Sequence, residues 1–134
     1  KPSHAVHRVG PQSSVLDALQ LLASEGIGAL LVMEDEKIVG IFTERDYARK
    51  GIIQGRKAKS TAVREVMTSG VFTVSPQDDI EDCMRLMSTK RIRHLPVMDG
   101  EAVVGVLSIG DIVTAVISEQ KGRIESLEQY ITGY

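Results

Sequence analysis

Residues 9–46 read VGPQSSVLDALQLLASEGIGALLVMEDEKIVGIFTERD, and the pattern returns at residues 74–111 as VSPQDDIEDCMRLMSTKRIRHLPVMDGEAVVGVLSIGD. Residues 8–47 align with residues 73–112 without a gap, and many of the unequal pairs exchange one apolar residue for another. Identical pairs include Pro11 with Pro76, Gly40 with Gly105, and Asp46 with Asp111. A gapless match of this length is rarely accidental, so the chain consists of two copies of one structural unit.

Each copy is predicted to fold as β-α-β-β-α. A short extended entry at residues 8–11 or 73–76 ends in proline, which disfavours helix in the residue before it. Two apolar strands, at 29–33 and 38–42 or at 95–99 and 102–107, enclose a polar turn and indicate a hairpin. A second helix is expected to start at Thr43 or Ser108. Between the entry and the hairpin, apolar residues recur at helical spacing, as Val15, Ala18, Leu19 and Leu22 or as Ile80, Cys83, Met84 and Met87.

The fold class that these elements predict is α+β, with tandem repeats and a long C-terminal helix. One copy alone has too little apolar surface for a good core, so we expect the copies to pack face to face with pseudo-two-fold symmetry. The glycine- and lysine-rich span 51–63 is the predicted linker. We therefore divide the chain into residues 1–60, the first repeat with its linker, and residues 61–134, the second repeat with the C-terminal helix.

The composition excludes several classes of protein. A net charge of −2 provides no basic field for a nucleic-acid backbone. The longest apolar run, residues 27–33, is too short to span a bilayer. A single cysteine, Cys83, rules out an intrachain disulfide and suits a reducing cytoplasm, which is the predicted location. The chain opens at Lys1 and not at a methionine, so we expect a trimmed start.

Two motifs at the expected helix starts suggest both a structural and a ligand-binding role. Thr43 and Asp46 have the spacing of a capping box, in which a hydroxyl and an acid satisfy free backbone N–H groups, and Ser108 and Asp111 repeat it. A helix start that follows a strand is also a natural anion site. A carboxylate there accepts hydrogen bonds from a sugar diol, while the hydroxyl and the N–H groups meet a phosphate. The two readings are compatible, and the spacing alone leaves both open.

The residues resemble the paired CBS domains, also called the Bateman module, from about His7 to Val116. The resemblance rests on the duplication, on RIRHLPVMD at 91–99, and on the glycine–apolar–apolar–Thr/Ser–x–x–Asp signature in both copies. The chain is most similar to small stand-alone bacterial proteins with two CBS domains. The resemblance implies that adenosine-containing ligands, namely AMP, ADP, ATP or NAD(H), bind in clefts between the repeats.

The resemblance also implies which residues line these clefts. Asp46 and Asp111 correspond to the ribose-binding aspartates, and Thr43 and Ser108 to the hydroxyls that face the phosphate. Residues just before the first hairpin strand would contact base and phosphate; they are Ile27 and Gly28 in the first copy and Ile92, Arg93 and His94 in the second. The start of the opposite copy is expected to contribute Thr68 and Phe72 to the Asp46 cleft and His7 to the Asp111 cleft.

The two copies are not equal. Arg45 follows Thr43 and adds a planar donor fork beside the expected helix start, whereas Ile109 and Gly110 follow Ser108. We therefore expect the Asp46 cleft to be the better nucleotide site, with the Asp111 site weak or empty.

The C-terminal segment carries a heptad pattern. Its apolar positions recur at steps of four and three, which is typical of a helix that packs along one seam. Such a helix can pack on its own domain, but it runs well past the duplicated unit, so a homodimer contact is favoured. The seam residues are Val113, Ile117, Gln120, Ile124, Leu127 and Ile131.

The predicted function is a non-catalytic regulatory module that senses adenosine nucleotides and signals through a dimer, acting on an unidentified partner. The alternative is a structural dimerisation or scaffold domain with vestigial nucleotide sites. Ser108, His94 and Asp111 are the residue types of a hydrolytic triad, but no G-x-S-x-G elbow is present in the sequence. No catalytic residue, no catalytic cofactor and no metal ligand is therefore predicted, and neither a nucleic acid nor a membrane is an expected partner.

Overall fold

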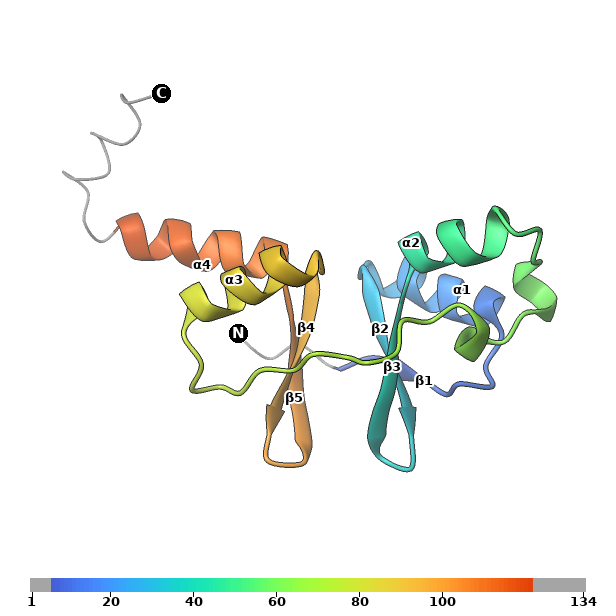
Figure 1. Cartoon of the computed structure of the whole chain (residues 1–134), viewed down its shortest axis with the longest axis horizontal. Helices are drawn as coiled ribbons and strands as arrows, with labels where there is room; N and C mark the ends of the chain where they lie inside the picture. The colour runs from blue at the N-terminus through green and yellow to red at the C-terminus, as the bar shows by residue number, and fades with distance from the viewer. Residues whose placement is uncertain (1–5, 122–134) are drawn as a thin grey trace, which may run out of the picture. The chain divides into compact units, whose positions relative to one another are not determined.

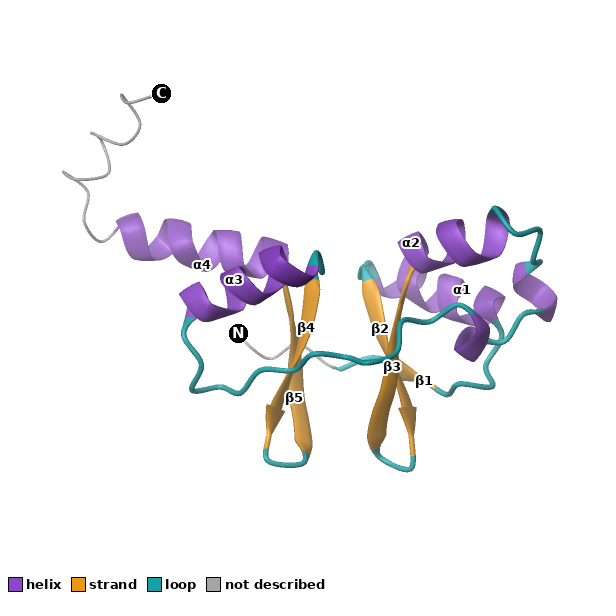
Figure 2. Cartoon of the chain, viewed as in Figure 1, coloured by secondary structure: helices purple, strands orange, loops and turns teal. Residues whose placement is uncertain are grey.

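The computed structural model describes residues 6–121 and divides the chain into two compact units, Lys1–Phe72 and Thr73–Tyr134 (Figure 1). Each unit combines an antiparallel hairpin with helices (Figure 2), which confirms the predicted α+β class. The repeat boundary that we place between residues 60 and 61 from the duplication remains a prediction, as does the packing of the two copies against each other.

Unit 1 contains a three-stranded sheet in the order β1-β2-β3. Strand β1 (Arg8–Val9) pairs in parallel with β2 (Ala29–Glu34), which pairs antiparallel with β3 (Lys37–Thr43). Helix α1 (Val15–Glu25) connects β1 to β2, and α2 (Glu44–Tyr47) follows β3 directly. Three short helical turns, Ala48–Ile52, Ala58–Ser60 and Val63–Glu65, complete the unit.

Local side chains explain where α1 begins and ends. The Ser14 hydroxyl accepts a hydrogen bond from the Asp17 N–H at 3.0 Å and caps the first turn. Gly26 ends the helix in the left-handed conformation with φ of 64°, which glycine adopts without a steric penalty. The hairpin turn that follows places Asp35 and Glu36 at positive φ, as the tight turns preferred between antiparallel strands require.

Unit 2 repeats the order of helix, hairpin and helix, but its entry strand differs. Helix α3 (Ile80–Lys90), strands β4 (His94–Asp99) and β5 (Ala102–Ser108) and helix α4 (Ile109–Lys121) are present as predicted. The predicted entry strand at 73–76 is reduced to one parallel bridge between Val74 and Val97. In unit 1 the Leu31 N–H donates to the His7 carbonyl at 3.2 Å, but the equivalent position in unit 2 is Pro96, which has no N–H. The second entry strand therefore lacks one of its ladder bonds.

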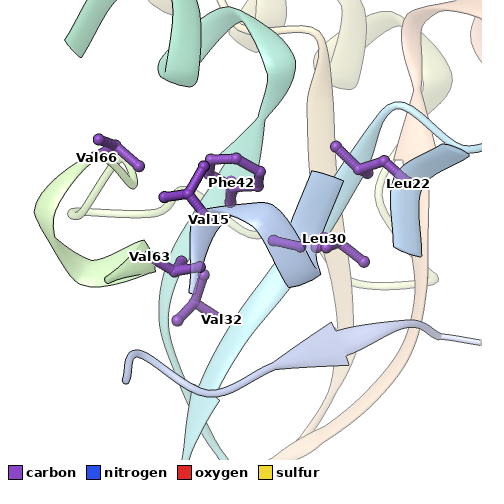
Figure 3. Close-up of a cluster of buried hydrophobic side chains, with 8 residues drawn as sticks. Val15, Leu22, Leu30, Val32, Phe42, Val63 and Val66 are labelled. Atoms are coloured by element: carbon purple, nitrogen blue, oxygen red, sulfur yellow. The ribbon is translucent and has the colours of Figure 1, made fainter. Parts of the chain in front are cut away.

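The core of unit 1 lies between α1, the hairpin and the segment that follows α2 (Figure 3). Val63 and Val66 are completely buried in it, although we predicted that residues 51–63 form a linker. The Thr61 carbonyl accepts from the Val15 N–H, and the Val63 N–H donates to the Ser13 carbonyl, both at 2.8 Å. Residues 61–66 are thus an integral part of unit 1. The buried cluster comprises Val15, Ala18, Leu22, Leu30, Val32, Phe42, Val63 and Val66.

Among the residues whose burial is described, the core of unit 2 is smaller and comprises Cys83, Met87, Leu95 and Ile112. Cys83 is 3% exposed and packs as a small apolar side chain, as its alignment with Ala18 indicates. Met84, by contrast, is 38% exposed, so its place on the predicted apolar face of this helix is wrong. Helix α4 is described only as far as Lys121, and the seam positions Ile124, Leu127 and Ile131 lie outside the described residues.

Candidate functional site

The first motif forms a complete capping box at the junction of β3 and α2. The Thr43 N–H donates to Asp46 Oδ2 at 3.0 Å, and the Asp46 N–H donates to Thr43 Oγ1 at 3.1 Å. Thr43 Oγ1 also donates to Asp46 Oδ2 at 3.2 Å. The extended backbone at Thr43, with φ of −132°, turns into the helix at this point. The capping role of these two side chains is therefore confirmed.

Thr68 joins this motif from a distant part of the sequence. Its hydroxyl donates to Asp46 Oδ1 at 2.9 Å. Its backbone pairs with Ile41 of β3 in both directions, at 3.0 and 2.9 Å, and so holds the residue beside the site. Lys50 Nζ donates to the carbonyl of Met67 at 3.2 Å and fastens the same segment. The structure thus brings together three predicted site residues, Thr43, Asp46 and Thr68.

Gly40 permits this close approach of the segment to β3. A Cβ atom on Gly40 would lie 2.5 Å from Met67 Sδ and 3.1 Å from the carbonyl oxygen of Thr68. Lys50 was not among the predicted site residues. It stands four residues after Asp46 in a helical stretch, which is the spacing that places two side chains on one face, and this signal could have identified it.

The second motif forms the equivalent box at the junction of β5 and α4. The Ser108 N–H donates to Asp111 Oδ2, and the Asp111 N–H donates to Ser108 Oγ, each at 3.0 Å. The strand register places His94 opposite Ser108, and the Ile109 N–H donates to the Arg93 carbonyl at 2.9 Å. Unit 2 therefore brings the predicted residues Arg93, His94, Ser108 and Asp111 to one end of its hairpin.

His94 has a lower pKa than a free histidine. Burial of the imidazole is the main cause, the negative charge of Asp111 opposes it, and the positive charge of Arg93 adds to the lowering. Among residues 6–121, no side-chain hydrogen bond joins His94 to Ser108.

The remaining predicted residues are placed separately. Ile27 and Ile92 are half-buried against the cores of their own units, and Gly28 lies in the turn before β2. His7 Nε2 lies 3.6 Å from Glu25 Oε1 within unit 1, and Phe72 is 42% exposed at the end of that unit. Arg45 is exposed in the first turn of α2. The ligand contacts that we predicted for these residues, and for the two motifs, remain predictions.

Within residues 6–121 no group of three or more histidine, cysteine, aspartate or glutamate side chains is arranged to hold a metal ion. Over the same range, every helix is too short or too polar to cross a membrane.

Two duplicated α+β units, each with an aspartate-capped strand-to-helix junction, define a tandem-repeat module. The model of the CBS domain family matches residues 2–52 and 63–118, so the chain belongs to the CBS-domain family.

Relatives support this assignment over most of the chain. The chain is 42% identical over 125 residues to the mitochondrial CBS domain-containing protein CBSX3 of Arabidopsis thaliana, covering 90% of this chain and 61% of that protein. It is 32% identical over 115 residues to the CBS domain-containing protein YhcV of Bacillus subtilis, covering 86% and 81%. The chain therefore spans less than two thirds of CBSX3 and most of YhcV.

Solved structures agree with the fold. A protein with CBS domains from Burkholderia ambifaria has a TM-score of 0.84 and 48% identity, with 87% of this chain and 85% of that one covered. CBSX2 in complex with AMP has a TM-score of 0.73 and 27% identity, covering 88% and 92%. The CBS domain pair of MJ0100, in complex with 5′-methylthioadenosine and S-adenosylmethionine, has a TM-score of 0.78 and 26% identity, covering 87% and 92%.

Proposed function

We propose that this chain is a non-catalytic regulatory module that binds an adenosine-containing ligand, AMP, ADP, ATP or NAD(H), at the junctions marked by Asp46 and Asp111. The observation that carries the proposal is the repeated motif, in which a strand ends in a hydroxyl residue and an aspartate occupies the next helical turn. The complexes of CBSX2 with AMP and of MJ0100 with adenosine derivatives support this class of ligand.

The chemistry of the two junctions suits such a ligand. Both aspartates stand in the first turn of a helix, where the backbone N–H groups stabilise the ionised carboxylate. An ionised carboxylate only accepts hydrogen bonds, and a ribose supplies hydroxyl donors. Arg93 beside the second junction adds a cationic group of the kind that binds phosphate. The clefts between repeats, and the cytoplasmic location, remain predictions.

The test is a thermal-shift panel of AMP, ADP, ATP, NAD, NADH and S-adenosylmethionine with GTP as control. A ligand at one hundred times its dissociation constant should add about 2.7 kcal/mol to the free energy of unfolding. Asp46→Asn and Asp111→Asn keep the shape of each side chain and remove its charge, so the shift should shrink in one variant or both. A wild-type protein that responds to no adenosine compound would refute the proposal.

A second candidate function is a dimerisation or scaffold domain. On α4, Ile109, Val113 and Ile117 are 43%, 51% and 50% exposed, whereas Ile112 on another side of the helix is buried in the core of unit 2. Exposed apolar residues one helical turn apart favour a protein contact. A hexameric CBS-CP12 protein, with a TM-score of 0.76 and 29% identity over 83% of this chain and 62% of that one, shows that related chains form oligomers.

We propose a homodimer for this chain, formed through that face of α4. Light scattering should give twice the chain mass for the wild type and the chain mass for Val113→Ser/Ile117→Ser. Val104→Ser is the matched control, because Val104 is equally exposed at 50% but lies on β5. A wild-type chain that is monomeric at all concentrations would refute the dimer.

A further inference from the structure

The carboxylate of Asp46 uses most of its hydrogen-bonding capacity within unit 1. Oδ2 accepts from the Thr43 N–H at 3.0 Å and from Thr43 Oγ1 at 3.2 Å. Oδ1 accepts from Thr68 Oγ1 at 2.9 Å. Because an ionised carboxylate offers about four lone-pair positions, these donors leave about one position for a ligand.

A ribose presents two neighbouring hydroxyl groups, and a diol held by one carboxylate needs two acceptor positions. One internal donor must therefore give way when both hydroxyls bind Asp46. The Thr43 N–H is fixed by the backbone at the start of α2, and Thr43 Oγ1 is itself held by the Asp46 N–H. The bonds within this box are half-buried, whereas the bond from Thr68 is exposed to solvent.

Thr68 is the donor that can yield without a change of fold. Both backbone bonds to Ile41 hold its main chain on β3, so its hydroxyl leaves Asp46 by rotation of one side-chain torsion alone. Solvent at this position then satisfies the released hydroxyl. The Thr43 N–H has no such freedom, because it belongs to the backbone of the cap. The Thr43 hydroxyl can rotate its proton, but the Asp46 N–H keeps its oxygen in the cap and its bond to Asp46 is half-buried, so solvent reaches a released proton less readily than at Thr68.

We propose that Thr68 is a specificity-determining residue of the adenosine site, whose hydroxyl competes with the ribose diol for Asp46 Oδ1. This inference rests on the proposed function. It assigns Thr68 a role opposite to that of a ligand contact, since removal of its hydroxyl strengthens binding. The cost of displacing Thr68 falls on ligands with a complete diol and spares those with a single ribose hydroxyl.

The test is calorimetric titration of the full chain with AMP and with 2′-deoxy-AMP. Thr68→Val removes the hydroxyl at nearly constant shape and should tighten AMP binding about tenfold, the size of one hydrogen bond to a charged group. The gain should disappear with 2′-deoxy-AMP, which has one ribose hydroxyl. Thr68→Ser should bind AMP like the wild type, and Thr73→Val, the same substitution at an exposed threonine, should change nothing.

A double-mutant cycle locates the effect at the carboxylate. The Asp46→Asn substitution replaces the charged acceptor by an amide. In that background, Thr68→Val should no longer tighten AMP binding. AMP binding that is equal or weaker in Thr68→Val than in the wild type would overturn this inference and leave the proposed function intact. The same holds if Thr68→Val still tightens AMP binding in the Asp46→Asn background. Absence of AMP binding in the wild type would refute both.

Discussion

The close packing of residues 67–68 on β3 can be tested with one substitution made at two equivalent positions. Gly40 and Gly105 align in the duplication, but a Cβ on Gly40 meets Met67 at 2.5 Å and the Thr68 carbonyl at 3.1 Å, whereas a Cβ on Gly105 meets no atom within 4 Å among the described residues. Met67 can move, but the Thr68 carbonyl is backbone and is held by Ile41. Gly40→Ala must therefore push the segment away from the strand.

Overpacking of this kind costs about 1–3 kcal/mol. Replacing glycine by alanine also restricts the unfolded chain, which stabilises either variant by about 0.4–1 kcal/mol. This second effect is common to both positions, so the difference between Gly40→Ala and Gly105→Ala isolates the steric term. We expect Gly105→Ala to be as stable as the wild type or more stable, and Gly40→Ala to be less stable than Gly105→Ala by about 1–3 kcal/mol.

Urea denaturation followed by circular dichroism measures the free energy of unfolding of the three proteins. The m-value should stay constant, because neither substitution changes the surface exposed on unfolding. Equal stability of the two variants would refute the reasoning, since it would mean that residues 67–68 do not rest against Gly40 in solution. A loss confined to Gly105→Ala would refute it as well.

Four further predictions concern burial and charge. Val63→Ala should lower the free energy of unfolding by about 2 kcal/mol, because it removes two buried methyl groups from the core of unit 1; a loss near zero in urea denaturation would contradict that packing. Burial raises the pKa of the Cys83 thiol, so Ellman's reagent should react slowly with the native chain and rapidly in urea, and fast native reaction would contradict it. The Asp111 charge raises the pKa of His94 and so opposes the effect of burial. Asp111→Asn should therefore lower the pKa of His94 further in an NMR titration. Asp99→Asn, at the far end of β4, is the control and should leave this pKa unchanged. Because the folded pKa of His94 lies below its unfolded value, the protonated imidazole favours unfolding, and stability should fall as the pH drops from about 6.5 towards the folded pKa; a stability that does not depend on His94 in that range would contradict this sign.

Much of the fold could be predicted from the duplication because each copy constrains the other. Hairpins, helices and capping boxes depend on local spacing, and they occur where the pattern predicts them. The shortened entry strand of unit 2 could also have been predicted from the sequence. Pro96 occupies the position at which Leu31 donates its N–H in unit 1. The difference becomes visible only when aligned residues of the two copies are compared for their ability to donate a backbone hydrogen bond.

The rest depended on contacts between distant residues, which spacing does not encode. The predicted linker, residues 51–63, is rich in glycine and lysine, yet Val63 at its end is buried in the core of unit 1. Thr68 lies twenty-two positions after Asp46, and only the pairing of its backbone with Ile41 places its hydroxyl at the carboxylate. We singled out Thr68 from the family resemblance and not from any periodicity in the sequence.

The two junctions show how a duplicated motif can acquire two chemical environments. Thr43 and Asp46 repeat as Ser108 and Asp111, and the backbone bonds of the cap are nearly the same length in both units. Among residues 6–121 the next neighbour differs: Asp46 is faced by a neutral hydroxyl from Thr68, and Asp111 by the ionisable imidazole of His94. A neutral hydroxyl keeps the same charge near neutral pH, whereas an imidazole gains a charge as the pH falls. Repetition of the cap therefore does not imply equal chemistry at the two junctions, because these neighbouring residues stand outside the repeated motif.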